Sequence, residues 1–128
     1  MSYTIKNLRQ VEDSAPKFGF SETQEAHFAR DDLDAETTGV SYHVVKPGKR
    51  QGFGHRHDET EEVYVVLSGT GRMKLDDEIV AVEPYDAIRV AGPVWRAFEA
   101  GEEGLEVLAV GMHNADDRGD MKQDFWTD

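Results

Sequence analysis

The residues with the clearest potential for chemistry lie in the segment 54–62, which reads GHRHDETEE. One residue separates His55 from His57, and Glu62 follows at the start of an apolar run. Side chains alternate between the two faces of an extended chain, so both histidines point one way and Arg56 points the other. Two imidazoles and a carboxylate with open coordination positions suit iron(II), and also manganese, nickel or zinc. The segment therefore predicts a metal ligand set of His55, His57 and Glu62.

The run that begins at Glu62 predicts a strand with two different faces. Tyr64 and Val66 share the face of Glu62, whereas Val63, Val65 and Leu67 take the other. If the first face is the interior, the imidazoles and the carboxylate meet in a mostly apolar pocket. A metal ion there would polarise a substrate oxygen or bind dioxygen.

Short β-type runs separated by turn residues follow through the middle and end of the chain. One predicted strand ends at Val45, and further strands are predicted at 62–67, 72–75, 78–82, 87–90, 95–98 and 105–110. Turns are expected at 47–48, 76–77, 83–84, 92–93 and 101–104, where proline, glycine or acidic residues cluster. Several short strands at this spacing favour an antiparallel sandwich or barrel.

The two ends of the chain are less regular. The segment 21–30 fits either a helix that opens on a capping box or a strand, and we favour a strand because the rest is β-type. An exposed acidic turn is expected at 31–38. The polar tail from Asp116 ends in Phe125 and Trp126, which we expect to pack on the barrel or on a partner.

Composition narrows the classes of function. The chain has 128 residues, no cysteine and a formal net charge of -12, which disfavours nucleic acid and anionic membranes as partners. No apolar run approaches the ~20 residues that span a bilayer, and the first residues lack a signal-peptide pattern. We therefore expect a single domain in the cytoplasm.

The segment 48–69 resembles the first motif of the cupin superfamily. His55, His57, Glu62 and Gly69 match the motif's histidine pair, glutamate and closing glycine. The leading glycine fits loosely, because Gly48 lies one residue further from His55 than is usual. The segment 84–98 is similar to the second motif in a degenerate form. Asp86 takes its acidic position, Gly92-Pro93 its turn in reversed order, and Phe98 its aromatic position.

The resemblance implies an all-β fold, an antiparallel double-sheet jelly-roll barrel. It implies a single small cupin domain over residues 1–128, with the barrel core at about 40–110 and the N-terminal strands and C-terminal tail packed on it. It also implies a homodimer, and the apolar outer strand faces require cover in any case.

This chain departs from metal-binding cupins at Arg96, where they place a final histidine, and at Ala100, where they place an asparagine. Arginine stays protonated and cannot replace the histidine as a ligand. Three outcomes remain open. The metal is held by His55, His57 and Glu62 alone; another inward residue such as His43 joins them; or no metal binds and Arg96 forms a bidentate pair with Glu62.

Arg96 also has a functional interpretation, as a clamp for the carboxylate or phosphate of a small ligand. An inward orientation is favoured because Phe98, a core-type residue, shares its face; the alternative is an outward Arg96 paired with surface acids. The candidate substrate-binding residues are Arg96, Tyr64, Phe98 and His43. His27 and His113 are expected at the surface or the core edge.

Three functions remain in competition. The protein binds a small, anionic metabolite in its barrel, with a divalent metal as an optional addition. Alternatively, it is a metal-dependent dioxygenase or isomerase that acts on a small oxygenated substrate. The third possibility is a stable scaffold with a vestigial site. Fold alone does not decide among them, because cupins host many reactions.

Overall fold

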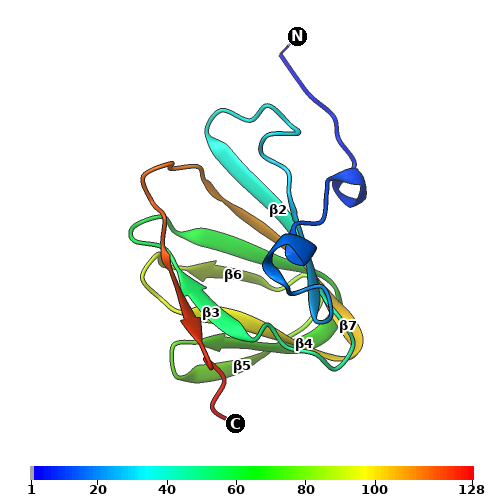
Figure 1. Ribbon diagram of the computed structural model, residues 1–128, viewed down its shortest axis with the longest axis vertical. Coiled ribbons are helices and arrows are strands. Elements are labelled where there is room, and N and C mark those ends of the chain that lie inside the picture. The colour runs from blue at the N-terminus through cyan, green and yellow to red at the C-terminus, as the bar shows by residue number, and fades with distance from the viewer. Residues whose placement is uncertain (1) are drawn as a thin grey trace.

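A computed structural model describes residues 2–128, and strands dominate it (Figure 1). Two 3-10 helices, η1 (Leu8–Gln10) and η2 (Ala15–Phe18), precede the sheet, and the described residues contain no α-helix. Within this part of the chain no helix is long and apolar enough to cross a membrane. The strands are β1 (Gln24–Phe28), β2 (Thr38–Val45), β3 (Phe53–Arg56), β4 (Glu62–Leu75), β5 (Glu78–Val82), β6 (Ala87–Val90), β7 (Arg96–Met112) and β8 (Asp120–Gln123).

The two longest strands, β4 and β7, pair along most of their length within a single eight-stranded sheet that curls into the barrel. The second half of β7 pairs with β2 and with the first half of β4, which also pairs with β6. At its start, β7 pairs with β3 and with the second half of β4, which pairs with β5. All pairs are antiparallel, so the predicted all-β, antiparallel jelly-roll barrel is confirmed.

Both long strands bend at glycines. The register between them shifts at Val66/Ser68 and at Gly69/Gly71. Gly69 and Gly104 have φ of 79° and 81°, and a Cβ on Gly69 would lie 2.0 Å from the Gly104 carbonyl oxygen. The predicted turn at 101–104 is therefore wrong: these glycines form an irregularity inside one continuous strand, because glycine serves a bulge as well as a turn.

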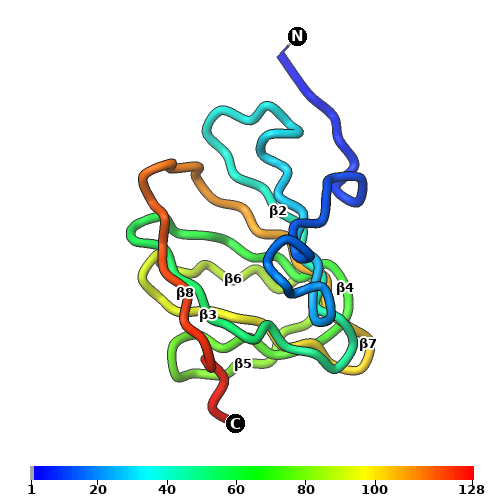
Figure 2. Tube along the Cα trace, in the orientation of Figure 1, coloured from blue at the N-terminus to red at the C-terminus, as the bar shows by residue number. Residues whose placement is uncertain are grey.

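The chain outside the range 40–110 extends the sheet at both ends. Strand β1 pairs with β2, so 24–28 is a strand and not a helix. Strand β8 pairs with β3, and Figure 2 shows this red C-terminal segment beside the green β3. Beyond β8, Phe125 is 3% exposed and a Cβ on Gly54 would collide with its ring. The Trp126 indole donates to the Gln51 carbonyl at 2.7 Å.

The hydrophobic core follows the alternation of β4 and β7. Tyr64, Val66 and Met73 of β4 are buried, as are Phe98 and Val107 of β7. Leu67, on the opposite face of β4, is 41% exposed. The face of Glu62 is thus the interior, as its alternation predicts, and the end of this core opens onto the candidate site.

Candidate metal centre and ligand cavity

His55, His57 and Glu62 converge on one point. A ligand atom from each lies within 4.8 Å of the others, close enough to share a metal ion. The His57 Nε2 lies 3.2 Å and the His55 Nε2 3.7 Å from the same oxygen, Glu62 Oε1. Strand β3 presents His55, the loop after it presents His57, and Glu62 opens β4, so local alternation and strand order together build the cluster.

Glu62 is the centre of this cluster. Its Oε1 also accepts a hydrogen bond of 2.7 Å from the Tyr64 hydroxyl, and its side chain is 18% exposed. Burial alone would raise the pKa of Glu62, but the hydrogen bonds from His55, His57 and Tyr64 outweigh it and hold that pKa far below its usual range. Burial, with the adjacent Glu62 charge, raises the pKa of Tyr64, which stays a neutral donor.

His57 bridges two carboxylates. The hydrogen bond with Glu62 raises the pKa of His57, with burial and the Arg96 charge opposing. On the other side of the ring, His57 Nδ1 lies 3.7 Å from Asp117 Oδ1. A carboxylate behind a histidine fixes the ring orientation at many metal sites.

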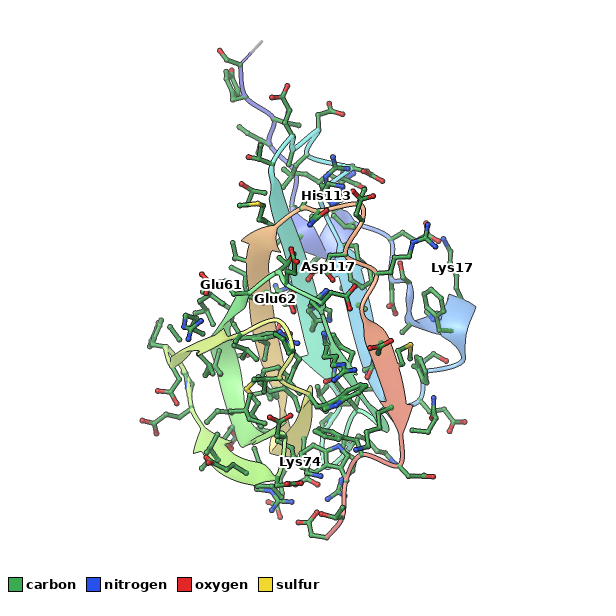
Figure 3. The ribbon with its side chains drawn as sticks, turned by 90° about the vertical axis from the view of Figure 1, so that its left-hand side faces the viewer. Lys17, Glu61, Glu62, Lys74, His113 and Asp117 are labelled. Atoms are coloured by element: carbon green, nitrogen blue, oxygen red, sulfur yellow. The ribbon has the colours of Figure 1, made fainter. Side chains whose placement is uncertain are left out.

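Asp117 itself was not predicted from the sequence. Its side chain is 3% exposed and accepts backbone N–H bonds from Asp58, Glu59 and Thr60 at 2.7, 3.0 and 2.7 Å. These donors outweigh burial and lower the pKa of Asp117. In Figure 3 Glu62 and Asp117 are labelled at mid-height, away from Lys74 at the lower end. Asp117 thus ties the C-terminal segment to the loop that carries His57.

Arg96 points inward and is fully buried, at 0% exposed. It is the register partner of His55 on the adjacent strand, which places it beside the cluster. Its Nη1 donates to the carbonyls of Gly92 and Val94 at 3.0 and 2.9 Å, and its Nη2 lies 3.6 Å from Glu62 Oε1. The bidentate pair with Glu62, one of the three outcomes left open, is therefore not formed, because Nε and Nη2 have no hydrogen-bond partner. Two backbone carbonyls hold the guanidinium in another direction.

His43 lies on the cavity wall but outside the metal cluster. Its Nε2 is within 2.7 Å of the Ser41 hydroxyl, and its ring packs edge-on against Phe28 at 5.7 Å. Burial, followed by the neighbouring His55, lowers the pKa of His43 to about 4. His43 is consequently a neutral ring at pH 7. One of the three open outcomes had His43 as a further ligand, but it lies outside the cluster of His55, His57 and Glu62.

The cluster lies at a cavity of about 330 Å³. Six aromatic side chains line it: Phe18, Phe20, Phe28, Phe53, Tyr64 and Phe98. Three arginines, Arg56, Arg96 and Arg118, face the same space against two carboxylates, Glu62 and Asp120. Arg56 pairs with Asp120 at 3.0 Å, whereas Arg118 has no ion pair within residues 2–128. The wall therefore carries an excess positive charge inside a strongly acidic protein.

Several wall residues were not predicted. Phe18 and Phe20 come from the N-terminal segment, and Phe20 packs on Phe53 with ring centroids 4.6 Å apart. Gln24 of β1 is 5% exposed and its Oε1 is unpartnered. His27, expected at the surface or core edge, is buried at 5% exposed but lies outside the cavity wall. No local pattern marks Phe18, Phe20 and Gln24, because they lie far from the 54–62 motif in the sequence and reach the cavity only through long-range packing.

The residues present could hold a divalent metal. The Nε2 atoms of His55 and His57 both face Glu62 Oε1, and nitrogen with carboxylate oxygen is a donor set that zinc, iron, manganese and nickel accept. A bound ion would supply Lewis acidity at this end of the cavity. Arg96 occupies the place of a further ligand and adds a positive charge there.

Comparison with known proteins agrees with this architecture. A cupin from Bacteroides fragilis is 21% identical with a TM-score of 0.72, over 91% of this chain and 88% of that one. The polyketide cyclase RemF from Streptomyces resistomycificus is 16% identical with a TM-score of 0.74, over 98% and 87%. A sugar phosphate isomerase from Silicibacter pomeroyi is 18% identical with a TM-score of 0.70, over 87% and 76%.

At these identities the structures show a shared fold alone. No curated protein matches the chain significantly. The family model for the cupin domain matches residues 41–111, more than half of the sequence, and this range contains the two histidines, the glutamate, the closing glycine and Arg96. The chain therefore belongs to the cupin family, as its two motifs indicated.

Proposed function

We propose that this protein binds a small anionic molecule in its barrel, beside a divalent metal held by His55, His57 and Glu62. One observation carries the proposal: the metal-type cluster and the buried Arg96 meet at one end of a cavity. Iron, manganese, nickel and zinc all remain candidates for the ion.

Charge balance links the ion to an anion. Without metal, the charge of Arg96 offsets that of Glu62. With a divalent ion, the positive charge of the ion and Arg96 exceeds the charge of Glu62 and Asp117 together, in a site where water cannot screen it fully. A carboxylate or phosphate on the ligand would restore the balance, and the unpaired Arg118 at the wall would attract it.

Elemental analysis of protein purified from cells supplemented with iron, manganese, zinc or nickel tests the metal. We expect near-stoichiometric metal in the native protein, and its loss in His57→Ala. His113→Ala, which removes an exposed histidine outside the cavity, is the matched control and should retain the metal. Metal-free native protein under all four supplements would overturn this half of the proposal.

Thermal unfolding tests the anion. Small carboxylates and phosphates should raise the Tm of the native protein, and raise it less in Arg118→Gln. Arg9→Gln is the control, because Arg9 is an exposed arginine outside this cavity. If the Tm rises equally in Arg118→Gln and Arg9→Gln, Arg118 does not contribute to anion binding. If the Tm of the native protein does not rise, the protein does not bind these anions.

An enzymatic role is the second candidate. Three protein ligands leave coordination positions open, which is the arrangement of catalytic rather than structural metal sites. Relatives of similar fold are named as a cyclase and a sugar phosphate isomerase. Metal-dependent dioxygenase or isomerase activity on a small oxygenated substrate, abolished in His57→Ala, is the result that would establish this role.

We also propose a homodimer in the cytoplasm that contacts neither nucleic acid nor membranes. The acidic net charge of -12 and the absence of cysteine support the location and the lack of nucleic-acid binding. Exposed apolar side chains such as Met112, at 72%, support a second copy as cover. Light scattering in solution measures the oligomeric state directly, and a monomeric mass would refute the dimer.

A further inference from the structure

Apolar side chains make a large share of the cavity wall. The six aromatic rings and the apolar side chains of Ala15, Ala26, Ala109 and Met121 are about half of its lining residues. Such a surface favours a ligand with an apolar, flat body, because stacked and edge-on aromatic contacts add to hydrophobic burial. The volume of about 330 Å³ exceeds the ~150 Å³ of a cavity that binds benzene.

Three neutral polar side chains on the wall already have a hydrogen-bond partner. The Ser41 hydroxyl bonds with His43, Gln51 Oε1 accepts from the Phe98 N–H at 3.0 Å, and Tyr64 donates to Glu62. A polyhydroxylated ligand would therefore leave several of its own hydroxyls without partners after losing water. Each such group costs binding free energy, so the wall selects against sugars.

One neutral acceptor is left without a partner. Gln24 Oε1 is buried on the cavity wall and receives no hydrogen bond. The other unpartnered buried atoms on this wall are the Nε and Nη2 donors of Arg96. Buried polar groups are rarely left unpaired, so these atoms indicate a ligand that offers one donor as well as an anionic acceptor group.

The cavity also has an apolar rim. Phe18, Phe28 and Met121 line it and are 67%, 55% and 56% exposed, so they stand where it meets solvent. Arg118 is exposed on the same wall. An entering ligand thus meets apolar side chains and a cation first, and the cluster around Glu62 lies at the more buried end.

From these observations we infer that the ligand is an aromatic hydroxy acid: a flat apolar ring that carries a carboxylate and one hydroxyl donor. This inference rests on the proposed function for its anionic part. The ring occupies the aromatic wall, the carboxylate is drawn to the positive groups, and the hydroxyl donates to Gln24.

Calorimetric titration with four probes separates the contributions of the ring, the carboxylate and the hydroxyl to binding. The probes are 4-hydroxybenzoate, benzoate, phenol and glucose 6-phosphate, each added to the protein as isolated and after equimolar Mn²⁺. We expect 4-hydroxybenzoate to bind at least about tenfold tighter than phenol or glucose 6-phosphate. Its affinity should exceed that of benzoate by about fivefold, which is the effect of one net hydrogen bond.

Three variants locate the contacts. Gln24→Leu should abolish the preference for 4-hydroxybenzoate over benzoate without weakening benzoate. Phe28→Ser removes a rim side chain that is already 55% exposed, and should weaken both acids about fivefold while the fold is retained. Tyr3→Ser removes an aromatic residue, 66% exposed, that lies outside the cavity and should change nothing.

The outcomes that overturn the inference differ from those that overturn the proposed function. Glucose 6-phosphate that binds as tightly as 4-hydroxybenzoate would refute the aromatic class and leave anion binding intact. Phenol that binds as tightly as 4-hydroxybenzoate would refute the anionic part alone. No binding of any probe, or unchanged affinity in Phe28→Ser, would reject the aromatic hydroxy acid.

Discussion

Two arginine–carboxylate clusters in this barrel differ in how completely their hydrogen bonds are made. Around Glu99, Arg50 and Arg72 both donate to the carboxylate, the latter through Nε at 2.8 Å. Arg72 also donates to Asp128 at 2.9 Å. Around Glu62, the nearest guanidinium nitrogen of Arg96 is 3.6 Å away, and two of its nitrogens have no partner.

The difference matters because of burial. The Arg50 and Arg72 side chains are 33% and 38% exposed, so water can complete any missing bond. Arg96 is 0% exposed and has no such alternative. Loss of the carboxylate should therefore cost more stability at the buried, incomplete cluster than at the partly exposed, completed one, and only the cluster in the cavity should also act on binding. Four measurements test this distinction.

The largest effect is expected for Glu62→Gln. The change leaves the Arg96 charge buried without its carboxylate, and should lower the free energy of unfolding by about 3 kcal/mol. Urea unfolding measures this loss. The double variant Glu62→Gln/Arg96→Met removes the stranded charge and should be more stable than Glu62→Gln alone. A double variant that is less stable would show that the two side chains do not compensate one another.

The second effect concerns metal affinity. Arg96→His replaces a cation with a potential ligand, and should tighten Zn²⁺ binding by at least about tenfold. Competition with a chromophoric chelator gives the affinity. Arg96→Gln removes the charge without adding a ligand, so it separates the two contributions. If neither variant binds Zn²⁺ more tightly than the native protein, Arg96 does not limit metal binding.

A smaller effect is expected at the completed cluster. Glu99→Gln weakens the ion pairs with Arg50 and Arg72, and should lower the free energy of unfolding by about 1 kcal/mol, as for partly exposed pairs. Metal content and ligand affinity should not change. Loss of either would mean that the tail cluster also supports the cavity, and the distinction between the two clusters would fail.

The smallest effect is a pH dependence from His27, another completed polar group. Its Nδ1 and Nε2 face the Val11 carbonyl and Glu25 at 2.7 and 2.9 Å, so both nitrogens donate only when the ring is protonated. Burial lowers the pKa of His27, but these bonds, with the nearby Asp13 charge, raise it overall.

The direction of the pH dependence of stability follows from the linkage between protonation of His27 and folding. Below the ordinary histidine pKa of about 6.5 the stabilisation is complete, and it is lost as pH rises through the higher folded-state pKa. Unfolding measured across this range should show the decline in the native protein and a shallower one in His27→Gln. His57, whose pKa is also raised, contributes with the same sign in both proteins. Equal slopes would exclude His27 as the source.

Local sequence rules predicted the convergence of His55, His57 and Glu62 better than the surroundings of that cluster. The spacing of His55 and His57 and the start of a strand at Glu62 were enough, because strand alternation decides where three nearby side chains point. The inward orientation of Arg96 could be predicted because Arg96 lies on the same strand face as Phe98, a core-type residue. Its hydrogen bonds did not, since the carbonyls of Gly92 and Val94 become available only through the geometry of the preceding turn.

Long-range packing explains what the sequence did not predict. Asp117 lies far along the chain from the loop that it binds, and Phe20 and Gln24 reach the cavity from the N-terminal side. Nothing in their neighbours distinguishes them from ordinary polar or core residues. The glycines at 101–104 misled for a different reason: the same residue type permits either a reversal or a bend within a strand, and only pairing with β4 decides between them.

The central place of β4 and β7 in the curled sheet has a consequence for how the barrel opens. The strands that pair with β4 cannot separate from those that pair with β7 without breaking the ladder that joins these two strands. Amide hydrogens at the centre of that ladder should therefore exchange with solvent only when the whole domain unfolds, whereas those of β8 exchange through local opening. The central pairing of β4 with β7 would then persist for as long as the protein remains native.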